Sequence, residues 1–182
     1  MNAIDLKDIK KSIIDIVESF PTNSDNLLHK NSYFRHVYSL LVDSDGFLEI
    51  GYRKGILVEV CRSLGIRSEH VDISDDLLKA TSSKENKCVT SSSIDYLKGC
   101  SKKFDLIFQD GSKEYGCRKK EYDLIIKNKI LKKEGKIIVD DLHYPGCKNA
   151  FLYAVQKYKF NSKTFNVNNV KENKNYIMGL LY

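Results

Sequence analysis

Acidic residues stand directly after several short apolar segments of this 182-residue sequence. Asp72 ends the segment Glu-His-Val-Asp, Asp110 follows Phe-Asp-Leu-Ile-Phe-Gln, and Asp140 and Asp141 follow Lys-Ile-Ile-Val. If these segments are parallel strands, the acidic residues share the edge of the sheet where α/β proteins bind ligands. Oxygen ligands from Asp110, Asp140 and Asp141 would suit Mg²⁺ or Ca²⁺. The same groups could instead act as a general base, accept hydrogen bonds or cap the following loop.

Three carboxylates buried side by side repel one another, so we expect a cationic group close to them. The candidates for this cationic group are Arg53, Lys54, Lys113 and His143. Lys113 and His143 are also candidate catalytic residues, because either could accept a proton from a substrate hydroxyl if its pKa were suitable.

A glycine-containing segment, Glu49-Ile50-Gly51-Tyr52-Arg53-Lys54-Gly55, lies where an apolar segment gives way to a helical pattern. Glycine there lets the backbone turn sharply and approach a ligand at a helix N-terminus. Asp72 lies 21 residues beyond Gly51, and a carboxylate at about that spacing binds ribose hydroxyls in nucleotide-type cofactors. A tight turn without a ligand and an N-cap role for Asp72 are the structural alternatives.

The elements that must position these residues alternate between strands and helices. Such alternation predicts a parallel sheet covered by helices on both faces. The last two strands are too close in sequence for a helical crossover, so they must pair antiparallel or lie apart. We expect strands at 47–50, 69–73, 88–90, 104–109, 136–139, 163–167 and 176–181, and helices at 56–64, 93–98, 118–131 and 146–158.

The predicted fold is therefore α/β: a Rossmann-like, doubly wound, mostly parallel seven-stranded sheet with an antiparallel last strand. The helical pattern of residues 1–43 predicts an N-terminal cap on the α/β core of residues 46–182. We expect a single domain, because no linker or repeat interrupts the chain and its length suits one hydrophobic core.

In this order the motifs resemble those of class I S-adenosylmethionine-dependent methyltransferases. The similarity is greatest to a small branch with the pattern E-I-G-x-x-x-G, then D, then D-G-x-H-x-Y, then G-G-x-I-x-x-D-D. The matching segments are Glu49–Gly55, Asp72, Asp110–Tyr115, Asp123 and Gly135–Asp141. Three positions differ from what the branch usually has: Arg53 and Glu134 each stand where a glycine is usual, and Lys113 stands where the branch has histidine.

The resemblance implies roles for individual residues. Gly51 and Gly55 would line the methionine end of the cofactor, Glu49 would lie near its ammonium group, and Asp72 would bind the ribose. Ser92 would meet the adenine, with Ser91 and Ser93 as alternatives, and Tyr52 and Ile73 would lie beside the cofactor. Asp110 would border the methyl-transfer site. In relatives similar to catechol O-methyltransferase, carboxylates at the positions of Asp110, Asp140 and Asp141 hold a divalent cation.

Composition limits the classes of partner. A net charge of +6 spread over a lysine-rich chain permits a nucleic-acid partner, but no basic motif interleaved with aromatic residues indicates one. No apolar run is long enough to span a membrane, and we expect a cytoplasmic protein with a small-molecule methyl acceptor. Three alternatives stay open: RNA methylation, a catalytically inactive binding protein with the same fold, and an NAD-dependent oxidoreductase.

Overall fold

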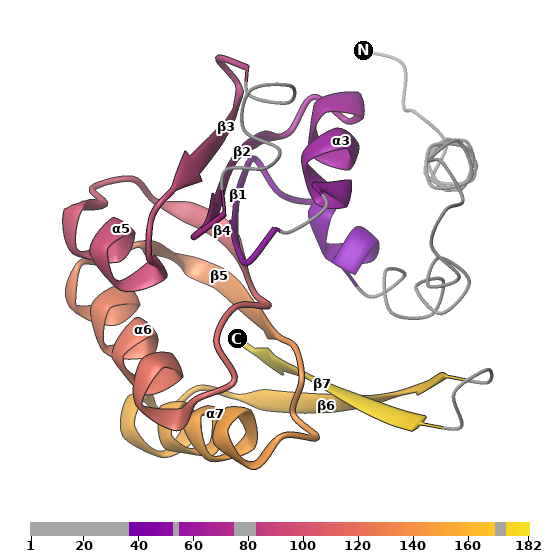
Figure 1. Cartoon of the computed structure of the whole chain (residues 1–182), viewed down its shortest axis with the longest axis vertical. Helices are drawn as coiled ribbons and strands as arrows, with labels where there is room; N and C mark the ends of the chain where they lie inside the picture. Colours follow the sequence, from indigo (N-terminus) through magenta and orange to yellow (C-terminus); the bar gives the residue numbers. More distant parts are fainter. Residues whose placement is uncertain (1–36, 53–54, 75–82, 170–173) are drawn as a thin grey trace.

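Seven strands form one sheet in the order β3-β2-β1-β4-β5-β7-β6 (Figure 1). The computed structural model describes residues 37–52, 55–74, 83–169 and 174–182. β7 runs antiparallel to both its neighbours, and the other six strands are mutually parallel. The strands are β1 (Gly46–Ile50), β2 (Arg67–Asp72), β3 (Asn86–Thr90), β4 (Phe104–Gln109), β5 (Leu131–Val139), β6 (Ser162–Asn169) and β7 (Lys174–Leu181). This topology confirms the predicted Rossmann-like sheet.

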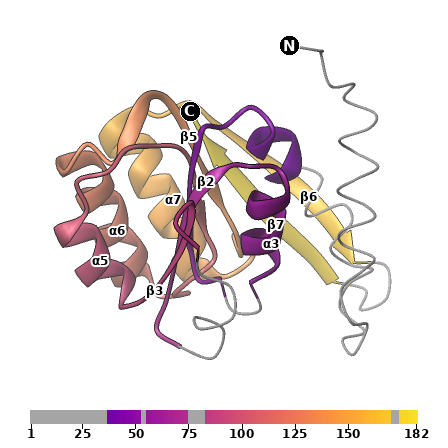
Figure 2. The same cartoon turned by 90° about the horizontal axis from the view of Figure 1, so that it is seen from above.

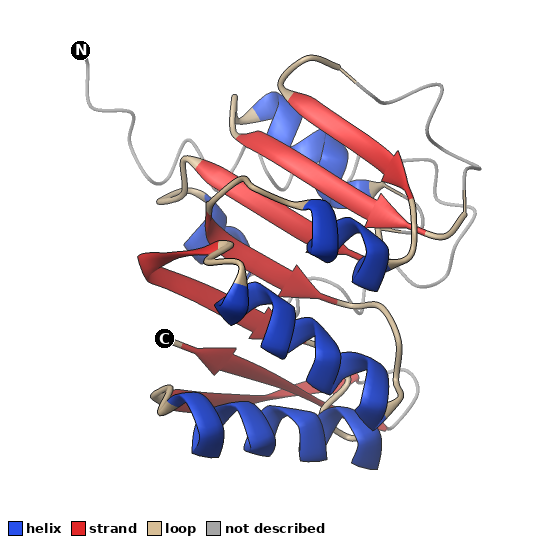
Figure 3. Ribbon diagram, turned by 90° about the vertical axis from the view of Figure 1, so that its left-hand side faces the viewer, coloured by secondary structure: helices blue, strands red, loops and turns tan. Residues whose placement is uncertain are grey.

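Helices cover both faces of the sheet (Figures 2 and 3). One face carries α5 (Ser93–Gly99), α6 (Tyr115–Lys127) and α7 (Pro145–Tyr158), and the other carries α3 (Ile56–Ser63). Alternate residues of β1 divide between two apolar cores: Leu48 and Ile50 face α5–α7, whereas Phe47 packs with Leu57 of α3. Glu49 shares the α3 face with Phe47, so a buried carboxylate lies next to this apolar core.

The carboxyl ends of the parallel strands are joined in register by backbone hydrogen bonds. Gly51 N–H donates to Val71 O (2.8 Å), and Ser91 N–H donates to Asp72 O (2.8 Å). On the other side of β1, Asp110 N–H donates to Ile50 O (2.8 Å), and Asp140 N–H donates to Gln109 O (3.0 Å). The first residues beyond β1, β3, β4 and β5 therefore stand in a row along one edge.

Several predicted boundaries differ from the observed ones: α6 begins at Tyr115 instead of 118, β5 at Leu131 instead of 136, and β2 at Arg67 instead of 69. The helix expected to reach residue 131 ends at Lys127, and Leu131 is already in β5. The helix ends in a Schellman motif, in which Ile130 N–H donates to Ile125 O (2.9 Å) and Lys129 N–H donates to Ile126 O (3.1 Å). Lys129 adopts the left-handed conformation (φ 54°) usually taken by glycine at this position, so the sequence carries no visible stop signal.

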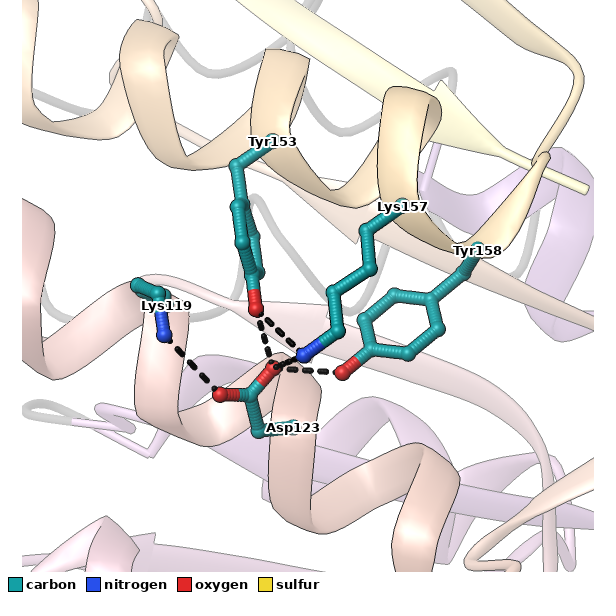
Figure 4. A network of polar contacts seen from close by, with 5 residues as sticks. All are labelled: Lys119, Asp123, Tyr153, Lys157 and Tyr158. Carbon is teal, nitrogen blue, oxygen red and sulfur yellow. Dashed lines mark hydrogen bonds and ion pairs between the residues drawn. The ribbon is translucent and has the colours of Figure 1, made fainter.

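A polar cluster joins α6 to α7 on the outer surface (Figure 4). Asp123 of α6 accepts hydrogen bonds from the Tyr153 hydroxyl (2.7 Å), the Lys157 ammonium (3.0 Å) and the Tyr158 hydroxyl. Lys119 forms an ion pair with the other carboxylate oxygen at 3.1 Å. Asp123, one of the residues on which the predicted resemblance rests, thus links α6 to α7. It lies outside the row of strand ends.

The predicted N-terminal cap falls mostly on residues 1–36, which lie outside the described residues. Residues 37–41 are helical, and Val37 and Leu41 are fully buried against the α3 side of the sheet. Among the helices that the structure describes, none has the length and apolar character needed to cross a membrane.

Candidate functional site

The turn after β1 is shaped by two glycines with positive φ. Gly51 has φ 89°, and Gly55, with φ 67°, is the N-cap of α3. A Cβ atom placed on Gly51 would lie 2.4 Å from the carbonyl oxygen of Asp110. Glycine is therefore required here because the turn after β1 and the loop after β4 approach each other closely. This reason is independent of the cofactor approach that the sequence predicts. Arg53 and Lys54 lie outside the described residues.

Glu49, near the end of β1, and Tyr52, in the turn after it, are both buried. Glu49 is 4% exposed, and its Oε2 atom lies 2.6 Å from Nδ1 of His70 on β2. Tyr52 is also buried; its ring meets the His70 ring edge-on, and its hydroxyl donates to Ser74 O at 3.4 Å. Tyr52 therefore links the turn after β1 to the loop after β2.

The loop after β2 presents a half-buried carboxylate and an exposed apolar side chain. Oδ1 of Asp72 accepts a hydrogen bond from Ser74 N–H at 3.1 Å, which fixes the carboxylate at the end of the strand. Ile73, next to it, is 80% exposed. A carboxylate beside an open apolar side chain is suited to a ligand with both a diol and a flat ring.

The serines after β3 are occupied by local contacts. Ser92 is the N-cap of α5: its hydroxyl oxygen accepts a hydrogen bond from Asp95 N–H at 3.1 Å. Ser91 donates to the carbonyl of Ser92, and Ser93 donates to Glu121 of α6 at 2.6 Å. Ser93 thus points toward α6, and Ser91 and Ser92 are the members of the predicted trio at the edge of the sheet.

Asp110, Asp140 and Asp141 converge as predicted. One carboxylate oxygen from each lies within 4.8 Å of the other two. Asp140 and Asp141 are each 6% exposed, and Asp110 is half-buried. Burial and the charges of Asp140 and Asp141 raise the pKa of Asp110 well above its usual range. Contact with the Asp140 side chain adds to this rise in the pKa of Asp110.

Lys113 supplies the cation expected beside these carboxylates. Its Nζ atom lies 3.1 Å from Oδ2 of Asp141 and 4.2 Å from the centre of the Tyr144 ring. Burial lowers the pKa of Lys113, but the hydrogen bond to Asp141 and the charge of Asp141 outweigh that effect and raise it. Lys113 is therefore protonated at neutral pH, which suits an electrostatic role better than that of a base.

His143 lies beside the same carboxylates. Its Nε2 atom is 3.7 Å from Oδ1 of Asp141. The imidazole packs against Tyr144 at 4.4 Å and edge-on against Tyr176 of β7 at 5.0 Å between ring centres. Lys113, His143 and the two tyrosines form a cationic and aromatic rim next to the carboxylates. The sequence patterns did not indicate Tyr144 or Tyr176, because the strand carrying Tyr176 has no motif of its own.

Arg118 is a further residue that the sequence patterns missed. It is fully buried, its Nη1 donates to Gln109 O (2.8 Å) and its Nε donates to Ser112 O. These two carbonyls flank Asp110 and Gly111, so the guanidinium fixes the loop that carries Asp110. The only sequence signal is an arginine one helical turn after Tyr115, in a segment rich in charged residues.

Solved structures of similar architecture are methyltransferases. The chain resembles the Podospora anserina methyltransferase PaMTH1 bound to SAH, with 14% identity, a TM-score of 0.63 and coverage of 99% of this chain and 97% of that one. For an O-methyltransferase from Bacillus cereus in complex with SAH the identity is 15%, the TM-score is 0.65 and the coverage is 98% and 93%. The chain has a methyltransferase fold.

A third structural relative acts on a named small molecule. It is the 1,6-didemethyltoxoflavin-N1-methyltransferase of Burkholderia thailandensis, with 11% identity, a TM-score of 0.66 and coverage of 100% of this chain and 92% of that one. No protein-family model matches the sequence, and no curated protein matches it. The likeness is thus one of fold, and the chemistry must be argued from the site.

Proposed function

We propose that the chain is an S-adenosylmethionine-dependent methyltransferase that methylates an oxygen atom of a small molecule. The observation that supports it most is the row of Gly51, Asp72, Asp110 and Asp140 along one sheet edge in a methyltransferase fold. In open α/β sheets this edge is where ligands bind.

The residues after β1, β2 and β3 would hold the cofactor. Asp72 would accept hydrogen bonds from the ribose diol, and Ile73 would pack on the adenine, with Ser92 at its edge. Glu49 would face the ammonium group of the methionine part, beside the Gly51–Gly55 turn. When bound, S-adenosylmethionine supplies a sulfonium methyl group, which an acceptor oxygen displaces in line.

The protein's main contribution to catalysis would be to position the acceptor and the cofactor relative to each other. Holding the acceptor oxygen and the methyl group in line removes an entropic barrier of up to about 7–11 kcal/mol. Arg118 fixes the Asp110 loop through two backbone carbonyls, and Lys113 holds Asp141. A rigid set of carboxylates at the end of β4 and β5 would orient the acceptor hydroxyl.

The three carboxylates also fit a divalent cation, because they offer one oxygen each within a few ångströms and are the ligand type that Mg²⁺ and Ca²⁺ prefer. A cation held there would lower the pKa of the acceptor hydroxyl. Asp110, Asp140 and Asp141 would be the ligands, and Lys113 would compete with the cation for Asp141. His143, on the rim, would receive the hydroxyl proton.

Titration calorimetry with the full chain tests whether the protein binds the proposed cofactor. Binding of S-adenosylhomocysteine and S-adenosylmethionine is expected, and methyl transfer to small hydroxylated aromatic and sugar acceptors should follow, with RNA as a comparison substrate. Failure to bind either nucleoside would overturn the proposal. Binding without transfer to any acceptor would favour an inactive binding protein of the same fold.

A further inference from the structure

Four polar side chains form a continuous line beneath the turn after β1. Asn86 of β3, Ser68 and His70 of β2, and Glu49 of β1 are each at most 4% exposed. Strand register places them together, since Ser68 pairs with Asn86 and Glu49 pairs with His70. They lie on the face of the sheet covered by α3, among apolar side chains. Buried polar groups in such a setting persist only when they are hydrogen-bonded.

The direction of these hydrogen bonds follows from the far end. The Asn86 amide nitrogen donates to Ile66 O (2.7 Å) and to Ser68 Oγ (2.8 Å), which uses both of its hydrogens. Ser68 Oγ lies 2.6 Å from His70 Nε2. The Glu49 carboxylate oxygen is the acceptor, so His70 Nδ1, at 2.6 Å, carries the hydrogen and donates it. The line of hydrogen-bonded side chains thus runs from the Ile66 carbonyl through Asn86, Ser68 and His70 to Glu49.

Aromatic rings fix the imidazole from other sides. Phe47 and Tyr52 both meet the His70 ring edge-on, at 5.9 Å and 6.4 Å between centres. His70 itself is completely buried, so it cannot touch a ligand. Its hydrogen bond to Glu49 is the polar contact through which it can act on a bound cofactor.

We propose that His70 is a positioning residue that aims the Glu49 carboxylate at the ammonium group of the cofactor's methionine part. The chain Asn86–Ser68–His70 fixes one oxygen of Glu49, which leaves the carboxylate in a single orientation next to Gly51. This inference rests on the proposed function, because it assigns Glu49 to the amino-acid end of S-adenosylmethionine. It predicts that His70 governs recognition of that end of the cofactor and has no effect on the nucleoside end.

Two substitutions of His70 separate its two ring nitrogens. In His70→Asn the side-chain amide takes the place of Nδ1 and can still donate to Glu49. In His70→Gln the amide reaches the place of Nε2, so the contact with Ser68 is kept and the contact with Glu49 is lost. Both variants are polar and of similar size, and their thermal unfolding shows whether each remains folded.

The probes are S-adenosylhomocysteine and 5′-methylthioadenosine, which shares the nucleoside but lacks the amino and carboxylate groups. His70→Gln should weaken binding of S-adenosylhomocysteine about tenfold, the effect of a charge-assisted hydrogen bond, and leave 5′-methylthioadenosine within about twofold. His70→Asn should bind both nearly as the native chain does. In a Glu49→Gln background, the His70→Gln substitution should add no further loss.

Other outcomes count against the inference. Equal losses for both nucleosides would make His70 a general structural residue, and unchanged binding in His70→Gln would remove it from cofactor recognition. If His70→Gln does not fold, Ser68→Ala provides the test, since it frees Nε2: unchanged binding of S-adenosylhomocysteine would then overturn the proposal. A native chain that binds neither nucleoside would refute the proposed function itself, a result distinct from selective failure of the His70 variants.

Discussion

Gly51 lies directly against the backbone of Asp110. A Cβ atom at Gly51 would be 2.4 Å from the Asp110 carbonyl oxygen and 2.9 Å from the Cα atom of Gly111. The turn after β1 and the loop after β4 are therefore packed backbone to backbone. A side chain that pushes these two backbones apart would move the proposed cofactor-binding turn away from the proposed methyl-transfer site.

Gly51→Ala should accordingly lower the free energy of unfolding through both backbone strain and steric overlap. A residue forced into an unfavourable φ costs about 1–3 kcal/mol, and the overlap with Asp110 adds to that cost. Gly65→Ala is a matched control, because Gly65 has φ 67° but no atom within 4 Å of the added Cβ. Urea unfolding of both variants measures the difference. Equal losses of stability would show that the Asp110 contact relaxes freely.

The sequence predicted where the strand-end motifs lie better than it predicted the residues that support them. Each strand-end motif has a local signature, an apolar run followed by glycine or aspartate, and each was found where expected. Arg118 and His70 have no such signature, because a charged or polar residue in an element normally faces water. Their burial depends on register: His70 is inside because it pairs with Glu49 across two strands. The early end of α6 was missed for a related reason, since Lys129 adopts a conformation that its side chain does not favour.

Asp72→Asn should weaken binding of S-adenosylhomocysteine and 5′-methylthioadenosine alike. The asparagine keeps an oxygen to accept the hydrogen bond from Ser74 N–H, so the turn after β2 is preserved. What is lost is the negative charge facing the ribose diol, and charge-assisted hydrogen bonds contribute about 1.5–3 kcal/mol. Calorimetry on both ligands distinguishes this loss from the selective one expected for His70→Gln. Unchanged affinities would exclude Asp72 from the ribose site.

Removing Lys113 should strengthen divalent-cation binding at the carboxylates. Lys113 neutralises Asp141 in the absence of a metal ion, so Lys113→Met would leave Asp141 free to join Asp110 and Asp140 in holding Mg²⁺ or Ca²⁺. Titration calorimetry with each metal salt measures the change. Lys119→Met is the control, because Lys119 pairs with Asp123 on the outer surface. Asp141→Asn should abolish the gain; a gain that persists in the double variant would place the cation elsewhere.

Asp123 should make the stability of the chain depend on pH at the acidic end. Partial burial of the carboxyl raises its pKa, but hydrogen bonds from Tyr158, Tyr153, Lys157 and Lys119 outweigh that effect and lower it below the usual range. A carboxylate whose pKa is lower in the folded than in the unfolded chain stabilises the fold above the unfolded-state value, near pH 4, and loses that contribution as the pH falls toward the folded-state value.

Asp123→Asn should therefore be less stable than the native chain at pH 7, and the difference should narrow as the pH falls through about 4 toward 2. Because the Asp123 side chain is 32% exposed, solvent screening keeps the effect modest. Glu59→Gln is a suitable control, since Glu59 pairs with Arg62 within the single helix α3 and joins no second element. Denaturant unfolding at pH 7, 4 and 2.5 gives the comparison. A stability gap that stays constant across this range would mean that Asp123 joins α6 to α7 through its shape and hydrogen-bonding oxygens alone, with no contribution from its charge.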